Sequence, residues 1–184
     1  DETMANRSIP YPRGKTLGGS SSINGLLYIR GQEQDYNIWR QLGNKGWGWE
    51  DVLPYFIKSE NQERGKNDFH GINGPLSVSD PRIKLDLLEK FMDAAEEKGI
   101  PKVDDFNKGD NFGCGYFQVT EKNGLRCSAA VGYLNPVKKR KNLKIETNCH
   151  VQKINFDGTK AISVSFWKNN QLNTIKANKE ILLS

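Results

Sequence analysis

The chain has 184 residues, of which 36% are hydrophobic, and 27 Lys and Arg outnumber 22 Asp and Glu to give a net charge of +5. This length suits one ordinary domain or parts of two, and this composition excludes a disordered chain. No stretch approaches the roughly 20 apolar residues that a membrane-spanning helix needs.

The cysteine count points away from an oxidised or metal-bound protein. Cys114, Cys127 and Cys149 are widely spaced along the chain. This spacing suggests neither a disulfide framework nor a set of metal ligands. We therefore expect no metal site and a reducing compartment.

Residues 13–31 combine glycines, three consecutive serines and the amide of Asn24 in one run. Glycine permits positive φ and close approach of the main chain, while serine and asparagine add short hydrogen-bonding groups. A flexible linker is disfavoured because the run includes apolar side chains that need burial: Ile23, Leu26, Leu27, Tyr28 and Ile29. We expect a polar or polyanionic cofactor to lie directly against this backbone.

Two helices are predicted after this block. Residues 32–42 have helical spacing at Ile38 and Leu42 and close at Gly43. The apolar positions from Trp49 to Ile57 follow the pattern of an amphipathic helix, which Pro54 must kink or restart. Residues 61–74 are predicted to form an exposed loop that leads to a strand at 76–78.

Residues 86–98 give the clearest helical pattern, with Leu88, Met92 and Ala95 on one face and Gly99 in the stop position. Residues 104–115 are typical of a loop, and a strand is expected at 116–120. Ser128 is predicted to cap a short helix over 129–134.

From residue 142 onward the sequence alternates between apolar and polar residues and predicts a β-meander with strands near 143–147, 151–156, 162–166 and 172–175. Asp157-Gly158 is a strong turn signal, and Asn169-Asn170 is a weaker one. Residues 180–184 contain an unbroken Ile-Leu-Leu run, which predicts a strand buried on both faces. Together these elements indicate a mixed α/β (α+β) fold.

A basic run precedes the meander: Lys138, Lys139, Arg140, Lys141 and Lys144. Such a run is usually a solvated helix end. Nucleic-acid binding remains a weaker alternative, because no aromatic residues interleave with these charges.

Two nucleotide-binding motifs are absent from the glycine-rich segments. Gly14-Lys15-Thr16 lacks the glycine of a P-loop, since Ile9 stands five residues before Gly14. The dinucleotide fingerprint G-x-G-x-x-G fails after Gly113 and after Gly46, because Gln118 and Asp51 occupy the position of its third glycine. A nucleoside triphosphatase is therefore disfavoured, and any dinucleotide would need its pyrophosphate turn elsewhere.

The order Gly-Lys-x-Leu-Gly-Gly-Ser-Ser-x-Ile-Asn from Gly14, followed by Tyr28, Gly31 and Asn37, resembles the first signature of the glucose-methanol-choline oxidoreductases. Further segments resemble the same family in the same order: residues 48–56, 69–76, 126–134 and 142–154. The sequences of residues 19–25 and 126–130 are most similar to those of the bacterial choline dehydrogenase and alkanol dehydrogenase branches. The resemblance covers nearly the whole chain.

The resemblance implies that this chain is an internal piece of a longer FAD-dependent enzyme. Residues 1–31 would belong to the FAD-binding domain and 32–75 to a lid-like helical connection. Residues 76–135 would begin an antiparallel-sheet substrate domain, and 136–184 would return to the FAD-binding domain. The family's catalytic His and its His or Asn partner are then expected beyond Ser184, so no catalytic residue is assigned within the chain.

The resemblance also nominates cofactor contacts, which are Thr16, Ser20, Asn24, Gly25, Leu26, Leu27 and Val151. Some family members tether FAD through a His directly before the Asn, where this chain has Ile23, so we expect non-covalent FAD. His70 and His150 are expected to be structural or solvent-facing. A place beside the substrate stays open for Tyr28, Trp47 and Trp49, although packing is their simpler role.

The implied reaction is oxidation of a primary alcohol or polyol, choline-like or alkanol, by hydride transfer to flavin N5. The implied partners are a small alcohol and an electron acceptor, which is a quinone, a dye-like acceptor or oxygen. No nucleic acid and no transmembrane segment are expected. We expect a cytoplasmic protein and leave peripheral association with the inner membrane open. The alternative is a catalytically inactive fragment or degenerate relative with a scaffold or binding role.

Overall fold

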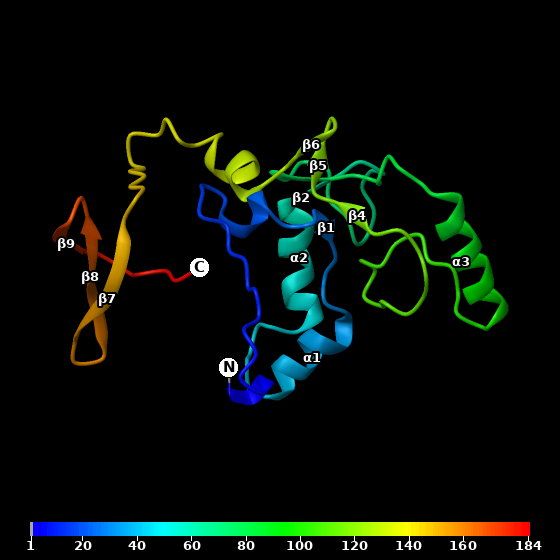
Figure 1. Ribbon diagram of the computed structural model, residues 1–184, viewed down its shortest axis with the longest axis horizontal. Helices are drawn as coiled ribbons and strands as arrows, with labels where there is room; N and C mark the ends of the chain where they lie inside the picture. Colours follow the sequence, from blue (N-terminus) through cyan, green and yellow to red (C-terminus); the bar gives the residue numbers. More distant parts are fainter. Residues whose placement is uncertain (1) are drawn as a thin grey trace. The chain divides into compact units, whose positions relative to one another are not determined.

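The computed structural model describes residues 2–184 and divides into two compact units, one ending at Val137 and the other running from Lys138 to Ser184 (Figure 1). The first unit mixes helices with short strands, and the second contains a three-stranded sheet. The predicted mixed α/β class is confirmed. No helix among the described residues is long and apolar enough to cross a membrane.

The first unit opens with a turn of 3-10 helix, η1 (Glu2–Met4), and a second one, η2 (Gly19–Ser22), lies inside the glycine block. Helix α1 (Glu33–Gln41) and helix α2 (Trp49–Ser59) follow. Each begins where an aspartate in its first turn accepts a hydrogen bond from a backbone N–H: Asp35 from Gln32 at 2.9 Å and Asp51 from Gly48 at 3.0 Å.

The two helices pack through aromatic side chains. The Tyr36 ring lies 5.8 Å from the rings of both Trp49 and Phe56. Helix α2 continues through Pro54 without a restart, so one of the two predicted effects of this proline does not occur. The predicted end of α1 at Gly43 is confirmed, because Gly43 takes a positive φ of 101° and the Gly43 and Asn44 N–H groups close a Schellman motif.

Short strands join distant parts of the first unit. Strand β2 (Glu60–Gln62) pairs in parallel with β3 (Leu76–Val78), and β1 (Leu27–Tyr28) pairs antiparallel with β4 (Gln118–Val119). Ser79 bridges to Val119 and connects the two pairs.

The prediction of an exposed loop over residues 61–74 is wrong at two places. Residue 62 closes strand β2, and the side chains of Gln62 and His70 are 4% and 2% exposed. These polar residues are buried because their hydrogen-bonding partners come from other parts of the chain. A local count of polar residues does not reveal such partners.

Helix α3 (Asp86–Glu97) ends at the predicted Gly99, again with a Schellman motif. Strand β4 is shorter than the predicted strand over 116–120. A hairpin of β5 (Glu121–Lys122) and β6 (Leu125–Arg126) follows and turns at Asn123-Gly124, where both residues have positive φ. The chain then forms a π-helical turn, η3 (Ala130–Leu134). The Ser128 hydroxyl accepts the Val131 N–H at 3.3 Å, which confirms the predicted cap.

In the second unit, β7 (His150–Asp157), β8 (Lys160–Lys168) and β9 (Gln171–Lys176) form an antiparallel meander. Both predicted reversals occur: Asn169-Asn170 turns the chain between β8 and β9, and Gly158-Thr159 turns it between β7 and β8, one residue later than the predicted Asp157-Gly158. Residues 143–147 and 180–184 form no strand, contrary to prediction, and Leu182 and Leu183 are 82% and 81% exposed. A strand needs a neighbour for its backbone N–H and C=O groups, and no described residue pairs with either segment.

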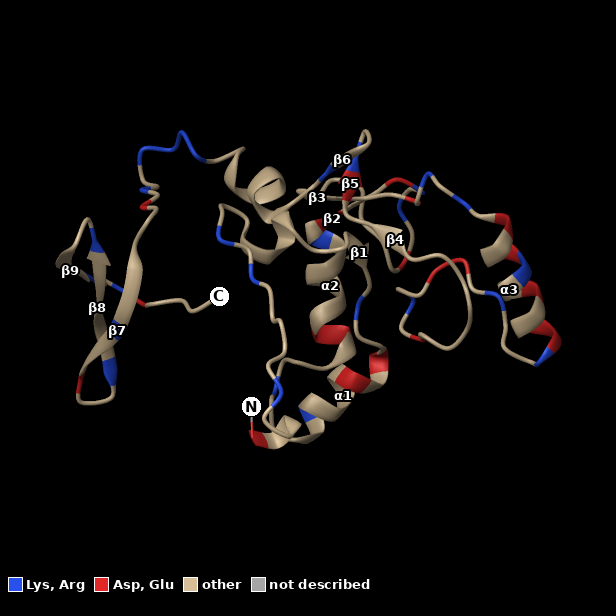
Figure 2. Cartoon of the chain, in the orientation of Figure 1, with Lys and Arg blue, Asp and Glu red and all other residues tan. Residues whose placement is uncertain are grey.

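The basic run over 138–144 lies in exposed turns and irregular chain before β7, not at the predicted helix end (Figure 2). The core of the first unit is small, with buried apolar side chains at Trp49, Val78, Met92, Phe106 and Cys127. The prediction that Ile23, Leu27 and Ile29 are buried is wrong in this structure, since they are 52%, 57% and 46% exposed. The glycine block therefore presents an apolar surface.

Candidate functional site

The glycine block folds back on itself through its own small side chains. The Ser21 hydroxyl donates to the Gly18 carbonyl at 2.5 Å, and the Ser22 hydroxyl donates to the Leu17 carbonyl at 2.9 Å. Gly18 has a φ of +89°, and a Cβ there would lie 3.1 Å from the Ala130 Cβ. Residue 18 therefore has to be glycine for the block to pack against residues 126–130.

Two of the predicted cofactor contacts, Thr16 and Ser20, also make hydrogen bonds within the block. The Thr16 carbonyl accepts the Gly19 N–H at 2.9 Å. The Ser20 hydroxyl accepts the Gly14 N–H at 3.2 Å, and both side chains at positions 16 and 20 are exposed. They thus shape the turn while remaining accessible.

The segment Asn24–Leu27 has open space at its glycine. A Cβ added to Gly25 would meet no heavy atom within 4 Å. The Asn24 amide oxygen accepts the Leu26 N–H at 3.1 Å and the Arg126 guanidinium at 2.6 Å. The Asn24 side chain is therefore fixed on one side and exposed on the other.

Leu26 has a φ of +69°, which is uncommon for a residue with a branched apolar side chain. Its carbonyl accepts the backbone N–H of Thr120 at 2.8 Å and the Thr120 hydroxyl at 3.1 Å. These two bonds hold the backbone in the strained conformation. A strained, doubly anchored residue beside an open glycine is a feature of binding sites.

Leu27 presents its backbone to the outside of the sheet. The register pairs Leu27 with Val119, and the neighbouring bond runs from the Thr120 N–H to the Leu26 carbonyl. In this antiparallel pattern the N–H and C=O of Leu27 point away from β4. They remain accessible to a ligand, as the predicted main-chain role requires.

Val151, the seventh predicted contact, belongs to the second unit. It lies in β7 opposite Phe166 and is 56% exposed. Six of the seven predicted residues thus lie on one segment of the first unit. Val151 lies in the second unit.

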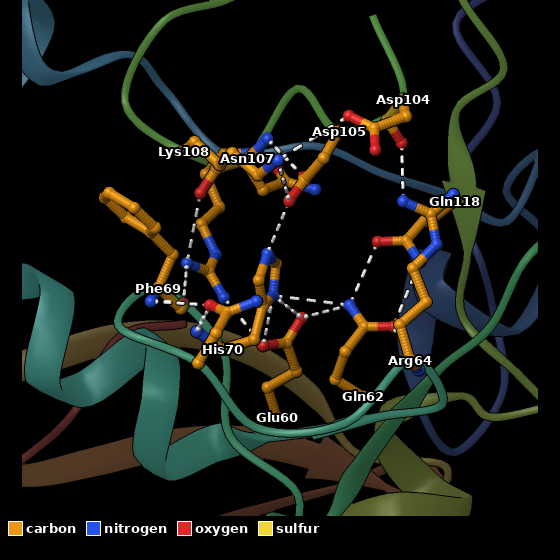
Figure 3. Close-up of polar contacts among 12 residues, drawn as sticks. Glu60, Gln62, Arg64, Phe69, His70, Asp104, Asp105, Asn107, Lys108 and Gln118 are labelled. Carbon is orange, nitrogen blue, oxygen red and sulfur yellow. Dashed lines mark hydrogen bonds and ion pairs between the residues drawn. The ribbon is translucent and has the colours of Figure 1, made fainter.

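A buried polar cluster includes Arg30, which follows β1 by two residues, and Figure 3 shows polar contacts of the cluster. We call it the His70 cluster, and it comprises Arg30, Glu60, Gln62, His70, Asp105 and Gln118. Each of these side chains is at most 8% exposed. Figure 3 shows the His70 ring between the carboxylates of Glu60 and Asp105.

Both ring nitrogens of His70 contact carboxylate oxygens. Nδ1 lies 2.8 Å from Glu60 Oε2, and Nε2 lies 2.9 Å from Asp105 Oδ2. A neutral imidazole can donate from one nitrogen only, so this geometry requires the charged ring. Burial by itself lowers the pKa of His70, but the hydrogen bonds and the negative charges of Asp105 and Glu60 together outweigh burial and raise the pKa to about 9.

The Asp105 carboxyl shows the reciprocal effect. Its burial raises its pKa, but the hydrogen bond and charge of His70, the Asn107 N–H and the charge of Lys108 together outweigh burial and hold the pKa below the usual range. Arg30 supplies the second positive charge and donates to Glu60 Oε2 at 2.9 Å. Two positive and two negative groups thus balance one another inside the cluster.

The amides extend the cluster toward the surface. The Gln62 and Gln118 side chains donate to each other at 2.9 Å in both directions, and Gln118 also donates to Asp80 at 2.9 Å. Arg30 ties the cluster to β1, because its side chain donates to the Tyr28 hydroxyl at 3.2 Å and its N–H donates to Asn107 Oδ1 at 2.8 Å. The cluster therefore anchors the chain three residues after Leu27.

The sequence interpretation missed this cluster, because its members are spread from residue 30 to residue 118. It treated His70 and His150 as structural or solvent-facing, and both expectations are confirmed: His70 is buried and His150 is exposed. In the sequence, the segment Phe69-His70-Gly71 indicates only a resemblance to the family. No spacing rule connects it with Arg30 or Asp105.

The family model for GMC oxidoreductases matches this chain over residues 2–184. Among curated proteins, an oxygen-dependent choline dehydrogenase of Sinorhizobium fredii is 40% identical over 181 residues, which are 98% of this chain and 33% of the relative. An alcohol dehydrogenase [acceptor] of Pseudomonas putida is 42% identical over 98% of this chain and 33% of the relative.

Solved structures give a consistent result. A FAD-dependent oxidoreductase from Chaetomium thermophilum matches with a TM-score of 0.87 and 32% identity over 95% of this chain. Pyridoxine 4-oxidase from Mesorbium loti matches with a TM-score of 0.84 and 30% identity over 90% of this chain. The chain spans about a third of the length of these relatives, 33% in each case.

Proposed function

Because the chain belongs to the GMC oxidoreductase family, we propose that it forms part of an FAD-dependent oxidoreductase that acts on the CH–OH group of a primary alcohol or polyol. The named relatives include a choline dehydrogenase and an alcohol dehydrogenase, which supports a choline-like or alkanol substrate. The domain assignment follows from the same resemblance: residues 1–31 and 136–184 in the FAD-binding domain, 32–75 in a connection and 76–135 in the substrate domain.

The segment Asn24–Leu27 carries this proposal. Space is open at Gly25, the Leu27 N–H and C=O point away from β4, and the Asn24 side chain is exposed. The exposed side chains of Ile23 and Leu27 flank residues 24–26 in the chain. A partly apolar ring with polar edges fits these residues, since glycine admits a flat surface and the main chain can pair with its edge.

FAD, when bound, would supply a two-electron acceptor for a hydride from the alcohol carbon. The residues of this chain would orient the ring and exclude water from one side of it. His70 is unsuited to take the hydroxyl proton, because both its nitrogens already donate to carboxylates. We assign the base to a His outside these 184 residues, with a His or Asn partner.

We propose that the flavin is held without a covalent bond. Ile23 occupies the position where some family members carry the tethering His, and an aliphatic side chain has no group that can form this bond. Acid precipitation of the full polypeptide that carries this chain tests the point. Free flavin is expected in the supernatant, and flavin retained on the precipitate would contradict it.

The activity is tested by expressing that polypeptide and recording its flavin absorption spectrum before and after anaerobic addition of choline, a primary alkanol or a polyol. Bleaching by one of them is expected. A protein without flavin, or a flavin that none of these alcohols reduces, would favour the alternative of an inactive scaffold or binding protein. Oxygen uptake measured against dye and quinone reduction identifies the electron acceptor, and cell fractionation tests the proposed cytoplasmic location and any attachment to the inner membrane.

A further inference from the structure

The β5–β6 hairpin and the residues after it hold the glycine block at two points. Arg126, the last residue of β6, donates from Nη1 to Asn24 Oδ1 at 2.6 Å and to the Ser21 carbonyl at 3.2 Å. The Ala129 N–H donates to the Ser21 hydroxyl at 2.8 Å. Residues more than 100 positions apart thus fix the orientation of the open segment.

These contacts determine which way the Asn24 amide faces. Oδ1 receives two hydrogen bonds, from the Leu26 N–H and from Arg126, and only the oxygen of an amide can accept them. No described residue receives a hydrogen bond from Asn24 Nδ2, and the side chain is exposed. The amide therefore presents two N–H donors outward.

Arg126 differs from three other arginines of the first unit in its partner. Arg30, Arg64 and Arg82 each pair with a carboxylate, at 2.9, 2.8 and 2.6 Å. Among residues 2–184, no carboxylate lies within ion-pair distance of Arg126, which is half-buried. The amide of Asn24 is its side-chain partner.

We propose that Arg126 is a positioning residue that locks Asn24 with its oxygen inward, so that Asn24 serves FAD as a hydrogen-bond donor and not as an acceptor. The inference rests on the proposed function, because it assumes that FAD lies against Asn24–Leu27. The acceptor on the cofactor is a ring carbonyl oxygen, a ring nitrogen or a ribityl oxygen. A neutral donor held beside an unpaired cation favours an electron-rich edge of the ligand.

The decisive variant is Asn24→Asp in the full polypeptide. A carboxylate keeps both inward hydrogen bonds, and its attraction to Arg126 preserves the local fold, but it turns an acceptor outward in place of the donor. We expect an unchanged melting temperature for the apoprotein and a dissociation constant for FAD raised at least about tenfold, as for the loss of one good hydrogen bond. Lys122→Ala, on the exposed β5 strand of the same hairpin, is the control and should bind FAD as the wild type does.

A double-mutant cycle separates positioning from general stabilisation. Asn24→Ala and Arg126→Ala should each weaken FAD binding, and the double variant should bind no more weakly than Asn24→Ala alone, because Arg126 acts through Asn24. Arg126→Lys should restore part of the affinity. Melting temperatures of the apoproteins report any loss of folding separately.

Two results would overturn the inference while leaving the proposed function in place. One is FAD binding by Asn24→Asp as tight as in the wild type. The other is a double variant whose loss equals the product of the two single losses. A wild-type protein that binds no FAD would instead overturn the proposed function, and this inference with it.

Discussion

Arg30 and Glu60 form an ion pair at 2.9 Å in which the two side chains are 1% and 0% exposed. The carboxylate of Glu60 also contacts His70, so one buried carboxylate pairs with two positively charged side chains. Replacing such a pair by apolar groups need not destabilise a protein, but removing one member leaves the others uncompensated. The His70 cluster is therefore sensitive to single substitutions.

Glu60→Gln should strongly destabilise the protein. The amide keeps the size of the side chain but leaves Arg30 and His70 with Asp105 as the remaining carboxylate of the cluster. We expect a loss of about 3–5 kcal/mol in the free energy of unfolding, measured by urea denaturation. The same substitution at the exposed pair, Glu63→Gln beside Arg82, should cost about 0–1 kcal/mol. Equal losses at the two sites would contradict a special role for the buried cluster.

Stability should depend on pH through His70. Its pKa in the folded protein is raised from 6.5 to about 9, so the folded state binds the proton more tightly than the unfolded state. This contribution is fully present below pH 6.5 and is lost as the pH rises through about 9. The melting temperature of the wild type should fall over this interval relative to that of His70→Gln. A constant difference between the two proteins would show that His70 is not charged.

Leu26 should tolerate asparagine better than valine. Asparagine adopts positive φ readily, whereas a β-branched side chain at a φ of +69° clashes with its own backbone. We expect Leu26→Val to lower the free energy of unfolding by about 1–2 kcal/mol more than Leu26→Asn does. Thermal melting of both variants provides the measurement, and the reverse order would argue against the left-handed conformation.

Gly25→Val should separate folding from cofactor binding. The added Cβ meets nothing within 4 Å, so the melting temperature of the apoprotein should stay close to that of the wild type. The new side chain would occupy the space proposed for the flavin and should abolish flavin retention during purification. Gly18→Ala is the contrasting variant, since its Cβ would lie 2.4 Å from the Ser22 hydroxyl at a φ of +89°, and it should lower the melting temperature. Normal flavin content in Gly25→Val would place the cofactor elsewhere.

The local features of the chain could be predicted from the sequence. Gly43 and Gly99 end helices, Asn169-Asn170 turns the meander, and Asp157-Gly158 lies within one residue of its other turn, because each signal depends on a few adjacent residues. Asn123-Gly124 is a signal of the same kind, and it turns the hairpin that carries Arg126. The order of residues in the motifs also predicts the family and its flavin motif. The match over residues 2–184 confirms the family.

Pairing between distant segments was decided by the tertiary structure alone. The alternating segment at 143–147 and the Ile-Leu-Leu run at 181–183 both predict strands, but a strand exists only where a neighbour receives its hydrogen bonds. Gln62 and His70 looked like loop residues, but Arg30, Asp105 and Gln118 supply their partners. Asn24 likewise offered an acceptor and donors in the sequence, and Arg126, which lies 102 residues further along, decides which of them faces outward. Burial of polar groups depends on such long-range partners, and no local pattern of residues records them.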